Sequence, residues 1–201
     1  HLQYAFVDTG AMYRAVALYL HRNHIDISDL KAVEKALQHI HISFEFNPTR
    51  QASDTLLNGE NVEQEIRKMY ISELVSQVAA ITIVRRAMVA QQQRMGEKKG
   101  LVMDGRDIGT VVFPDAELKI FMTASPETRA QRRFDELEAK GDNVSYEEVL
   151  KNVQERDYID THREDSPLVI ADDAIEIDNS YLTREEQFKA VLELVEEIIN
   201  Q

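Results

Sequence analysis

The sequence predicts an α/β protein with a parallel sheet covered by helices on both faces. Short apolar runs of strand length, such as residues 5–7, 101–103 and 118–122, alternate with longer segments of helical period. Parallel strands that are buried on both faces have this continuous apolar character. Polar clusters follow the apolar runs directly, and open α/β sheets bind their ligands at that place.

The first strand is followed by two helices. Residues 5–7 end in Asp8-Thr9-Gly10, and apolar residues then recur at the helical period from Met12 to Leu20. Tyrosines and methionines at this spacing are assigned to the core. A second, shorter helix is expected from Ser28, whose side chain is typical of an N-cap.

A small antiparallel lobe is expected over residues 42–62. Apolar and polar residues alternate from Ile42 to Phe46, which is the period of a half-buried strand. Asn58-Gly59 is the dipeptide that best indicates a two-residue hairpin, and strand-forming residues flank it on both sides.

Helices and parallel strands alternate again beyond residue 70. We expect helices over residues 71–95, 126–140 and 145–164, and strands over residues 101–103, 118–122 and 174–177. Pro126 suits the first turn of its helix. Thr183 with Glu186 predicts a capping box for a terminal helix.

Composition limits the classes of function. The 201 residues carry a formal net charge of −13, which argues against a partner of duplex nucleic acid. Apolar runs are too short to span a bilayer, so we expect no membrane association and a cytoplasmic protein. The absence of cysteine excludes disulfides, thiolate metal sites and cysteine nucleophiles. Any chemistry must therefore use oxygen, nitrogen or bound ions.

One four-residue segment concentrates candidate chemistry. Asp104-Gly105-Arg106-Asp107 follows a buried strand directly. Asp104 could hold Mg²⁺ through water, and Arg106 could clamp a phosphate. An Asx-turn with a surface ion pair explains the same four residues equally well.

Arginines recur at helical spacing in the predicted helices 126–140 and 145–164. They are Arg129, Arg132, Arg133, Arg156 and Arg163. A solvated helical face accounts for any one of them. Together they fit a mobile arm that brings positive charge to a transferring phosphoryl group. Asp160 lies between Arg156 and Arg163 on one face, where it could orient both or accept a sugar hydroxyl.

Four segments, in this order and spacing, resemble bacterial cytidylate kinases. The segments are Asp8–Arg14, Val84-Arg85, Asp104–Pro114 and Glu155-Arg156-Asp157 with Asp160 and Arg163. The third is long and distinctive, and the resemblance extends along nearly the whole chain. It implies transfer of the γ-phosphoryl group of ATP to CMP or dCMP with Mg²⁺, by an enzyme that we expect to be a monomer.

The resemblance also implies an architecture. The fold would be of the P-loop nucleoside monophosphate kinase type: three layers with a parallel sheet, an antiparallel monophosphate-binding insert and a helical lid. The core would comprise residues 1–41, 71–125 and 166–201, the insert residues 42–70, and the lid residues 126–165.

Site residues follow from the matching positions. Thr9 stands where a hydroxyl meets the acceptor phosphate, and Arg14 and Arg106 stand as phosphate clamps. The positions that match readers of the cytosine edge are Ser76, Arg85 and Asp107. The positions that match lid-side contacts to ribose and phosphates are Arg156, Asp160 and Arg163. The arginines expected to stabilise the transferring group are Arg106, Arg132, Arg133, Arg156 and Arg163.

The sequence departs from the family pattern in one respect. The Gly-x-x-x-x-Gly-Lys-Ser/Thr loop has no counterpart, because no glycine is followed by lysine. Since the chain starts at His1 and not at Met, we expect that loop to precede the sequence given. Two other functions stay open: a non-catalytic nucleotide-binding module, and another small-molecule P-loop kinase such as one for shikimate or gluconate. The latter leaves Ser76, Arg85 and Asp107 unexplained.

Overall fold

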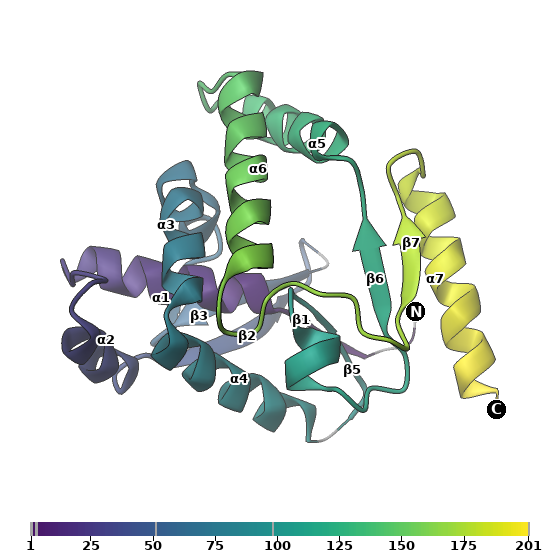
Figure 1. Ribbon diagram of the computed structural model, residues 1–201, viewed down its shortest axis with the longest axis horizontal. Coiled ribbons are helices and arrows are strands. Elements are labelled where there is room, and N and C mark those ends of the chain that lie inside the picture. The colour runs from purple at the N-terminus through teal and green to yellow at the C-terminus, as the bar shows by residue number, and fades with distance from the viewer. Residues whose placement is uncertain (1, 3, 51, 98, 201) are drawn as a thin grey trace.

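The structure is a computed structural model that describes residues 2, 4–50, 52–97 and 99–200. His1, where the sequence starts, therefore lies outside the described residues. The elements are β1 (Ala5–Asp8), α1 (Thr9–Arg22), α2 (Leu30–Leu37), β2 (Ile42–Asn47), β3 (Ala52–Leu57), β4 (Glu60–Asn61), η1 (Glu65–Arg67), α3 (Met69–Ala80), α4 (Thr82–Gly96), β5 (Leu101–Asp104), η2 (Ile108–Val112), β6 (Ile120–Thr123), α5 (Pro126–Ala139), α6 (Tyr146–His162), β7 (Ile175–Asp178) and α7 (Arg184–Ile199) (Figure 1). This order confirms the predicted α/β class.

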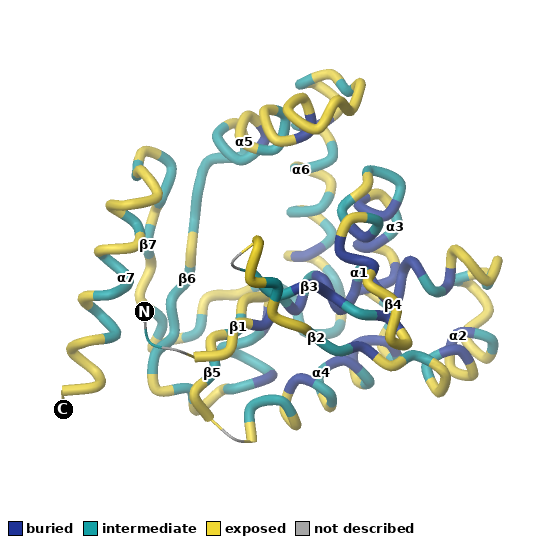
Figure 2. The backbone as a smooth tube through the Cα atoms, turned by 180° about the vertical axis from the view of Figure 1, so that it is seen from behind, coloured by how far each residue is buried: buried dark blue, intermediate teal, exposed yellow. Residues whose placement is uncertain are grey.

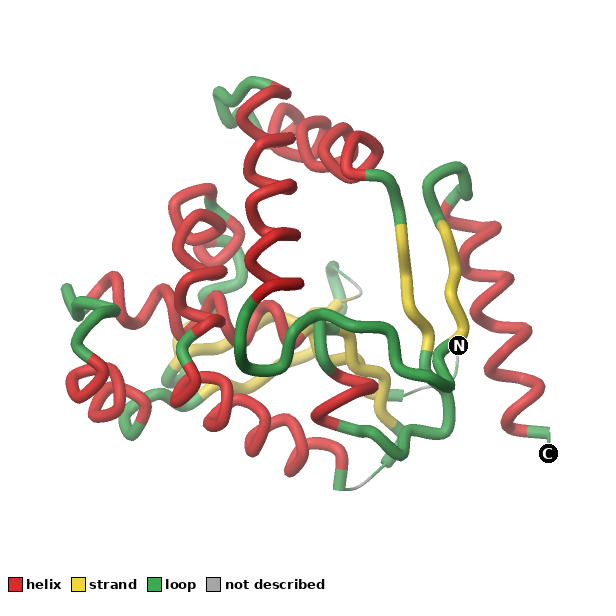
Figure 3. The backbone as a smooth tube through the Cα atoms, viewed as in Figure 1, coloured by secondary structure: helices red, strands yellow, loops and turns green. Residues whose placement is uncertain are grey.

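The parallel strands form two separate pairs. β1 pairs with β5, and β6 pairs with β7, both in parallel. The sequence predicts one sheet, whereas over the described residues the two pairs share no ladder (Figure 3). Periodicity identifies strands but carries no information about which strands pair, so this difference could not be read from the apolar runs.

The antiparallel lobe is confirmed as the sheet β2–β3–β4. Asn58 and Gly59 have φ values of 52° and 84°, the two positive φ angles that a type I′ turn requires. The Asn58 side chain accepts from the backbone N–H of His41 at 2.8 Å and donates to the carbonyl of His39 at 2.9 Å. The turn residues therefore also fix the entry of the chain into the lobe.

Two helix predictions need correction. The N-cap of α2 is Asp29 and not Ser28, because the Asp29 carboxylate accepts from two backbone N–H groups while the Ser28 hydroxyl donates to Asp26. The helix expected over residues 71–95 is two helices, α3 and α4. Ile81 separates them in an extended conformation with ψ 116°.

The main core surrounds α1, whose residues Ala11, Met12 and Val16 have no exposed surface. Figure 2 shows the buried positions gathered on α1, α3 and α4, whereas α7 has no buried residue. Helices α5 and α6 carry a second cluster of their own around Ala130 and Leu137.

None of the helices that the structure describes combines the length and the apolar content needed to cross a membrane.

Candidate active site

A cavity of about 280 Å³ lies at the carboxyl ends of β1 and β5. The parallel register places Asp8, the last residue of β1, opposite Asp104, the last residue of β5. Helices α1, α3, α4 and α6 and the turn η1 supply the other walls. Polar groups at the carboxyl ends of parallel strands are where an α/β protein binds its ligand.

Asp8 organises the strand-end wall. Its Oδ1 caps α1 by accepting from the N–H of Ala11 at 2.8 Å, and its Oδ2 accepts from Arg14 at 2.7 Å and from Arg67 at 2.8 Å. Burial alone would raise the pKa of Asp8, but the two guanidinium groups hold it below its usual value. Asp8 therefore stays ionised and fixes two arginines at the cavity.

A hydroxyl and a glycine bring the two strand ends together. The hydroxyl of Thr9 donates to the carbonyl oxygen of Asp104 at 2.6 Å. A Cβ atom at Gly105 would collide with the Thr9 hydroxyl oxygen. Glycine at position 105 therefore permits the close approach of β1 and the segment that follows β5.

The deep end of the cavity holds a buried ion pair. Arg85 and Asp107 are 1% and 4% exposed, and Arg85 Nη2 donates to Asp107 Oδ2. Arg85 Nη1 also donates to the carbonyl of Ala79 at 3.2 Å, which satisfies a free carbonyl at the end of α3. The break at Ile81 thus turns α4 so that its first arginine reaches both the end of α3 and the cavity. Its guanidinium lies 5.5 Å from the centre of the Tyr13 ring.

The α6 wall centres on Asp160, which is 5% exposed. Its carboxylate accepts from Arg106 Nε at 2.8 Å and from Arg163 Nη1 at 3.4 Å. Arg156, on the same helix, has its pKa lowered to about 10 by burial and by the neighbouring positive charge of Arg106. Arginines held this close together repel one another until an anion lies between them.

Buried donors without partners gather in this one cavity. Six side chains have a buried polar atom that forms no hydrogen bond within the part of the chain that is described, and five of the six line the cavity. These five are Tyr13, Arg14, Arg85, Arg156 and Arg163. The lining contains six arginines against four aspartates. Because buried polar groups are normally paired, the arrangement fits a polar anionic ligand that supplies the missing acceptors.

Comparison with known proteins decides the family. The model of the family described as "Cytidylate kinase" matches residues 1–197. The chain belongs to the cytidylate kinase family.

Relatives cover most of the chain. A protein named cytidylate kinase from Flavobacterium johnsoniae is 65% identical, over 98% of this chain and 87% of its own length. The homologue from Flavobacterium psychrophilum is 63% identical over 98% and 89%, and that from Bacteroides thetaiotaomicron is 59% identical over 92% and 82%. Both carry the same name.

The structure brings together most of the residues that the family resemblance singled out. Those that line the cavity are Thr9, Arg14, Ser76, Arg85, Asp104, Arg106, Asp107, Arg156, Asp160 and Arg163. Two arginines of α5, Arg132 and Arg133, do not line it. Arg132 donates to Asn179 in the loop after β7, and Arg133 donates to Glu136 and to the carbonyl of Arg67.

Sequence reasoning missed Tyr13 and Arg67 as cavity residues. Tyr13 has the helical spacing of a core residue and is indeed buried, with a pKa raised to about 12 by that burial. Arg67 lies in the short turn η1 and carries no local motif. The one available signal for Arg67 was its place in the sequence, between the antiparallel lobe and the helices of the core.

Asp104 is the candidate metal-binding side chain. Partial loss of solvation against the cavity walls raises the pKa of Asp104 to about 6, and repulsion from the facing Asp8 carboxylate raises it as well. A divalent cation would relieve the repulsion between these two carboxylates. No group of three or more potential protein ligands occurs in the described ranges.

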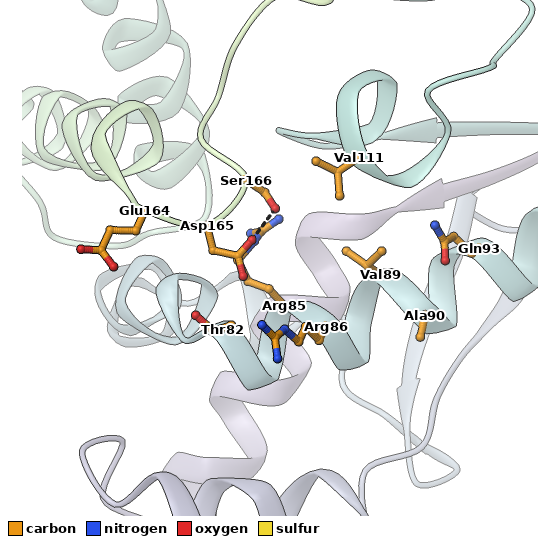
Figure 4. Close-up of a pocket in the computed structure, with 10 residues that line it drawn as sticks. All are labelled: Thr82, Arg85, Arg86, Val89, Ala90, Gln93, Val111, Glu164, Asp165 and Ser166. Atoms are coloured by element: carbon orange, nitrogen blue, oxygen red, sulfur yellow. Dashed lines mark hydrogen bonds between the residues drawn. The ribbon is translucent and has the colours of Figure 1, made fainter.

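A larger cavity of about 560 Å³ lies on the other side of Arg85 (Figure 4). It is bordered by α4, by Val111 of η2 and by the turn Glu164–Ser166 after α6. Its lining alternates charged side chains with Val89 and Ala90. The convergence of unpaired donors, and not size, makes the smaller cavity the candidate active site.

The raised pKa of Asp104 predicts a pH-dependent gain in stability for Asp104→Asn in the nucleotide-free protein. Ionisation of a group whose pKa is raised by folding lowers the free energy of unfolding as pH rises from about 4 through about 6. Asp104→Asn has no carboxyl group at this position, so its free energy of unfolding escapes this decrease. Two pK units correspond to about 3 kcal/mol, but solvent reaches the side chain, so we expect about 1 kcal/mol at pH 7.5 and almost none at pH 4.

Urea unfolding of both proteins at the two pH values measures this difference. Asp8→Asn is the matched control of opposite sign, because the Asp8 carboxylate is held below its usual pKa by Arg14 and Arg67. Its loss should destabilise the protein at pH 7.5. A stability difference for Asp104→Asn that does not grow between the two pH values would contradict the repulsion between the two carboxylates.

Proposed function

We propose that this chain transfers the γ-phosphoryl group of ATP to CMP and dCMP, with the cavity at the ends of β1 and β5 as the acceptor site. The observation that carries the proposal is the convergence of unpaired buried donors and six arginines in that one cavity. A nucleoside monophosphate offers what they lack: phosphate oxygens, sugar hydroxyls and a base edge.

Asp107, Arg85 and Ser76 recognise the base in this proposal. An ionised Asp107 accepts from the N4 amino group of cytosine, whereas uracil presents an O4 acceptor at the same place. Arg85 Nη2 donates to Asp107 Oδ2, and Arg85 Nε has no partner among the described residues. Arg85 can therefore also donate to the base. In this proposal, the negative charge of the buried Asp107 is what makes the site select cytosine over uracil.

Arg14 and Arg106 hold the acceptor phosphate at the strand ends, where the Thr9 hydroxyl donates to the carbonyl of Asp104. Phosphoryl transfer needs mainly positioning and neutralisation of charge, and no covalent intermediate. Acceptor and donor phosphates repel each other, so several arginines at their junction lower the barrier. Arg156 and Arg163 add positive charge from the lid side, and Asp160 orients Arg106 and Arg163.

Mg²⁺ bound with ATP would neutralise charge on the donor phosphate oxygens, and Asp104 is the residue proposed to hold it through water. At this position the protein would supply a single carboxylate, that of Asp104, which faces Asp8 at the ends of the paired strands β1 and β5.

The proposed lid comprises residues 126–165, between a core formed by residues 1–41, 71–125 and 166–201 and an insert at residues 42–70. Its helices α5 and α6 share a separate apolar cluster, and Arg129 bridges them through two hydrogen bonds to Asp157 at 2.8 and 2.6 Å. Both features support movement of the pair as one body. The proposed hinges are near Ser125-Pro126 and Ser166-Pro167, and Ser166 has a φ of 51°.

Nucleotides should slow amide exchange in the lid. We expect the segment 128–165 to exchange faster without ligand and to gain protection when CMP and a non-hydrolysable ATP analogue are added together, because closure excludes water. Hydrogen exchange with mass spectrometry measures it, with α1 as the internal reference that stays protected throughout. Equal protection of the segment in both states would contradict a lid.

A coupled assay with CMP, dCMP, UMP and no acceptor tests the proposed function. With the intact protein, we expect turnover with CMP and dCMP well above that with UMP. Calorimetry with CMP separates the remaining alternatives: binding without turnover would indicate a non-catalytic nucleotide module. Neither binding nor turnover would reject the acceptor assignment.

A further inference from the structure

Glu63 is a buried carboxylate with no part in the proposed reaction. It is 2% exposed and lies between β4 and η1 in the insert. Its Oε2 accepts from the backbone N–H of Thr55 at 3.1 Å and from the Thr55 hydroxyl at 2.7 Å. Its Oε1 accepts from Arg67 Nε at 3.0 Å and lies 2.9 Å from Arg67 Nη2. One oxygen is thus fixed to the antiparallel sheet, and the other faces Arg67 and, at 3.5 Å, Arg50 Nη2.

Arg67 carries that connection from the insert to the other parts of the protein. Its Nη2 also donates to Asp8 Oδ2 in the core at 2.8 Å, although the two residues are 59 positions apart. Its carbonyl oxygen accepts from Arg133 on α5 at 3.1 Å. Its side chain lines the active-site cavity together with Arg14. Insert, core and proposed lid therefore meet at this one residue.

The carboxylates of Glu63 and Asp8 hold the Nε and Nη2 edge of the Arg67 guanidinium and leave its Nη1 group available. Glu63 contacts Nε and Nη2, and Asp8 contacts Nη2. Nη1 has no hydrogen-bond partner in the portion of the protein that the structure covers. A guanidinium fixed along one edge presents its remaining N–H groups in a set direction, with little entropy left to lose on binding an anion.

We propose that Glu63 is a positioning residue that holds Arg67 toward the phosphate of the acceptor nucleotide. The inference rests on the proposed function and deepens it, because it assigns the insert a part in recognition of the phosphate. Glu63 touches no substrate and acts through Arg67. Its fixed contacts to Thr55 transmit the position of the antiparallel sheet to the cavity.

Glu63→Gln tests the proposal by comparing a nucleotide with its nucleoside. The amide keeps the size of the side chain but loses the charge that attracts Arg67. We expect CMP affinity, measured by calorimetry, to fall about tenfold, in keeping with the loss of one charge-assisted contact. Cytidine, measured as a competitor of CMP, should change less than twofold because it lacks the phosphate.

Glu65→Gln is the matched control, two residues away in the same turn. Glu65 bonds to Arg22 and Tyr70 on the outer surface and does not line the cavity. The control should leave affinity for both ligands unchanged. A Glu63→Gln variant that binds CMP like the wild type, or that weakens CMP and cytidine equally, would overturn the positioning role. A wild-type protein that binds no CMP would overturn the proposed function and this inference with it.

A double substitution separates positioning from folding. In an Arg67→Gln background, Glu63→Gln should cost no further CMP affinity, because the residue through which it acts has gone. Additive losses in the double variant would overturn the proposal.

Thermal unfolding checks that each variant is folded. If Glu63→Gln fails to fold, Glu63→Asp keeps the charge on a shorter arm and should give an intermediate loss for CMP only; an unchanged CMP affinity would count against the proposal.

Discussion

Asp107→Asn is expected to lower the ratio of kcat/KM for CMP over UMP by about one to two decades. The substitution keeps the size of the side chain but replaces a carboxylate oxygen with an amide that can donate to uracil O4. CMP loses a charge-assisted hydrogen bond, and UMP loses a repulsion between two acceptors. Each such base contact is worth about 1–3 kcal/mol. Initial rates at low substrate concentration measure the ratio.

The ratio matters more than the absolute rate because Asp107 also supports Arg85. The pair is buried, so a neutral residue at position 107 leaves the arginine charge poorly compensated and lowers stability. A smaller folded fraction reduces both activities equally and cancels in the ratio. Asp160→Asn is the matched control: it changes a buried aspartate of the same cavity that bonds to Arg106 and Arg163. Both substrates should then decline together. An unchanged ratio in Asp107→Asn would remove that residue from base recognition.

The strand-end part of the candidate site could be predicted from the sequence, because the position of its residues depends on their place directly after a strand. Asp8 and Asp104 each follow an apolar run directly, and parallel strands bring their carboxyl ends to one edge. The same logic placed Arg106 and Asp107. Residues that sit within three positions of a strand end are held in place by the strand itself, so their proximity follows from the topology alone.

The deeper parts of the site depend on contacts that no local pattern encodes. Tyr13 has the spacing of a core helix residue, and its unpaired hydroxyl becomes apparent only when the surrounding side chains are placed. Arg67 reaches Asp8 across 59 residues. The break at Ile81 lies within a continuous helical period, and the bond from Arg85 to the carbonyl of Ala79 that spans it becomes visible only in the structure. None of these three features follows from the residues that adjoin it in the sequence.

Gly105→Ala is expected to lower kcat/KM for CMP by about two decades with little change in base preference. The added Cβ would collide with the Thr9 hydroxyl oxygen and press on Ile108 Cδ1 at 2.9 Å. Thr9 is buried and Ile108 is half-buried, so neither side chain can move aside freely. The Thr9 hydroxyl must therefore give up its hydrogen bond to the carbonyl of Asp104. The two strand ends that carry Asp8 and Asp104 would then separate. A displacement of about 1 Å at a reacting centre is enough for a loss of about 10²-fold.

Two further variants separate loss of the strand-end geometry from general damage. Gly109→Ala lies in the same segment, but its Cβ would meet the Lys119 side chain at 3.1 Å and not Thr9, and a shift of a few tenths of an ångström relieves that contact, so activity should stay within about threefold of the wild type. Thr9→Val removes the hydroxyl without adding bulk, and it should reproduce part of the Gly105→Ala loss if the Thr9–Asp104 bond is what the glycine protects. Because the collision lies at the phosphate end, the CMP/UMP ratio should stay constant in all three variants. Near wild-type activity of a folded Gly105→Ala protein would show that the junction of β1 and β5 tolerates widening, and the acceptor phosphate would then have to be held by the arginines alone.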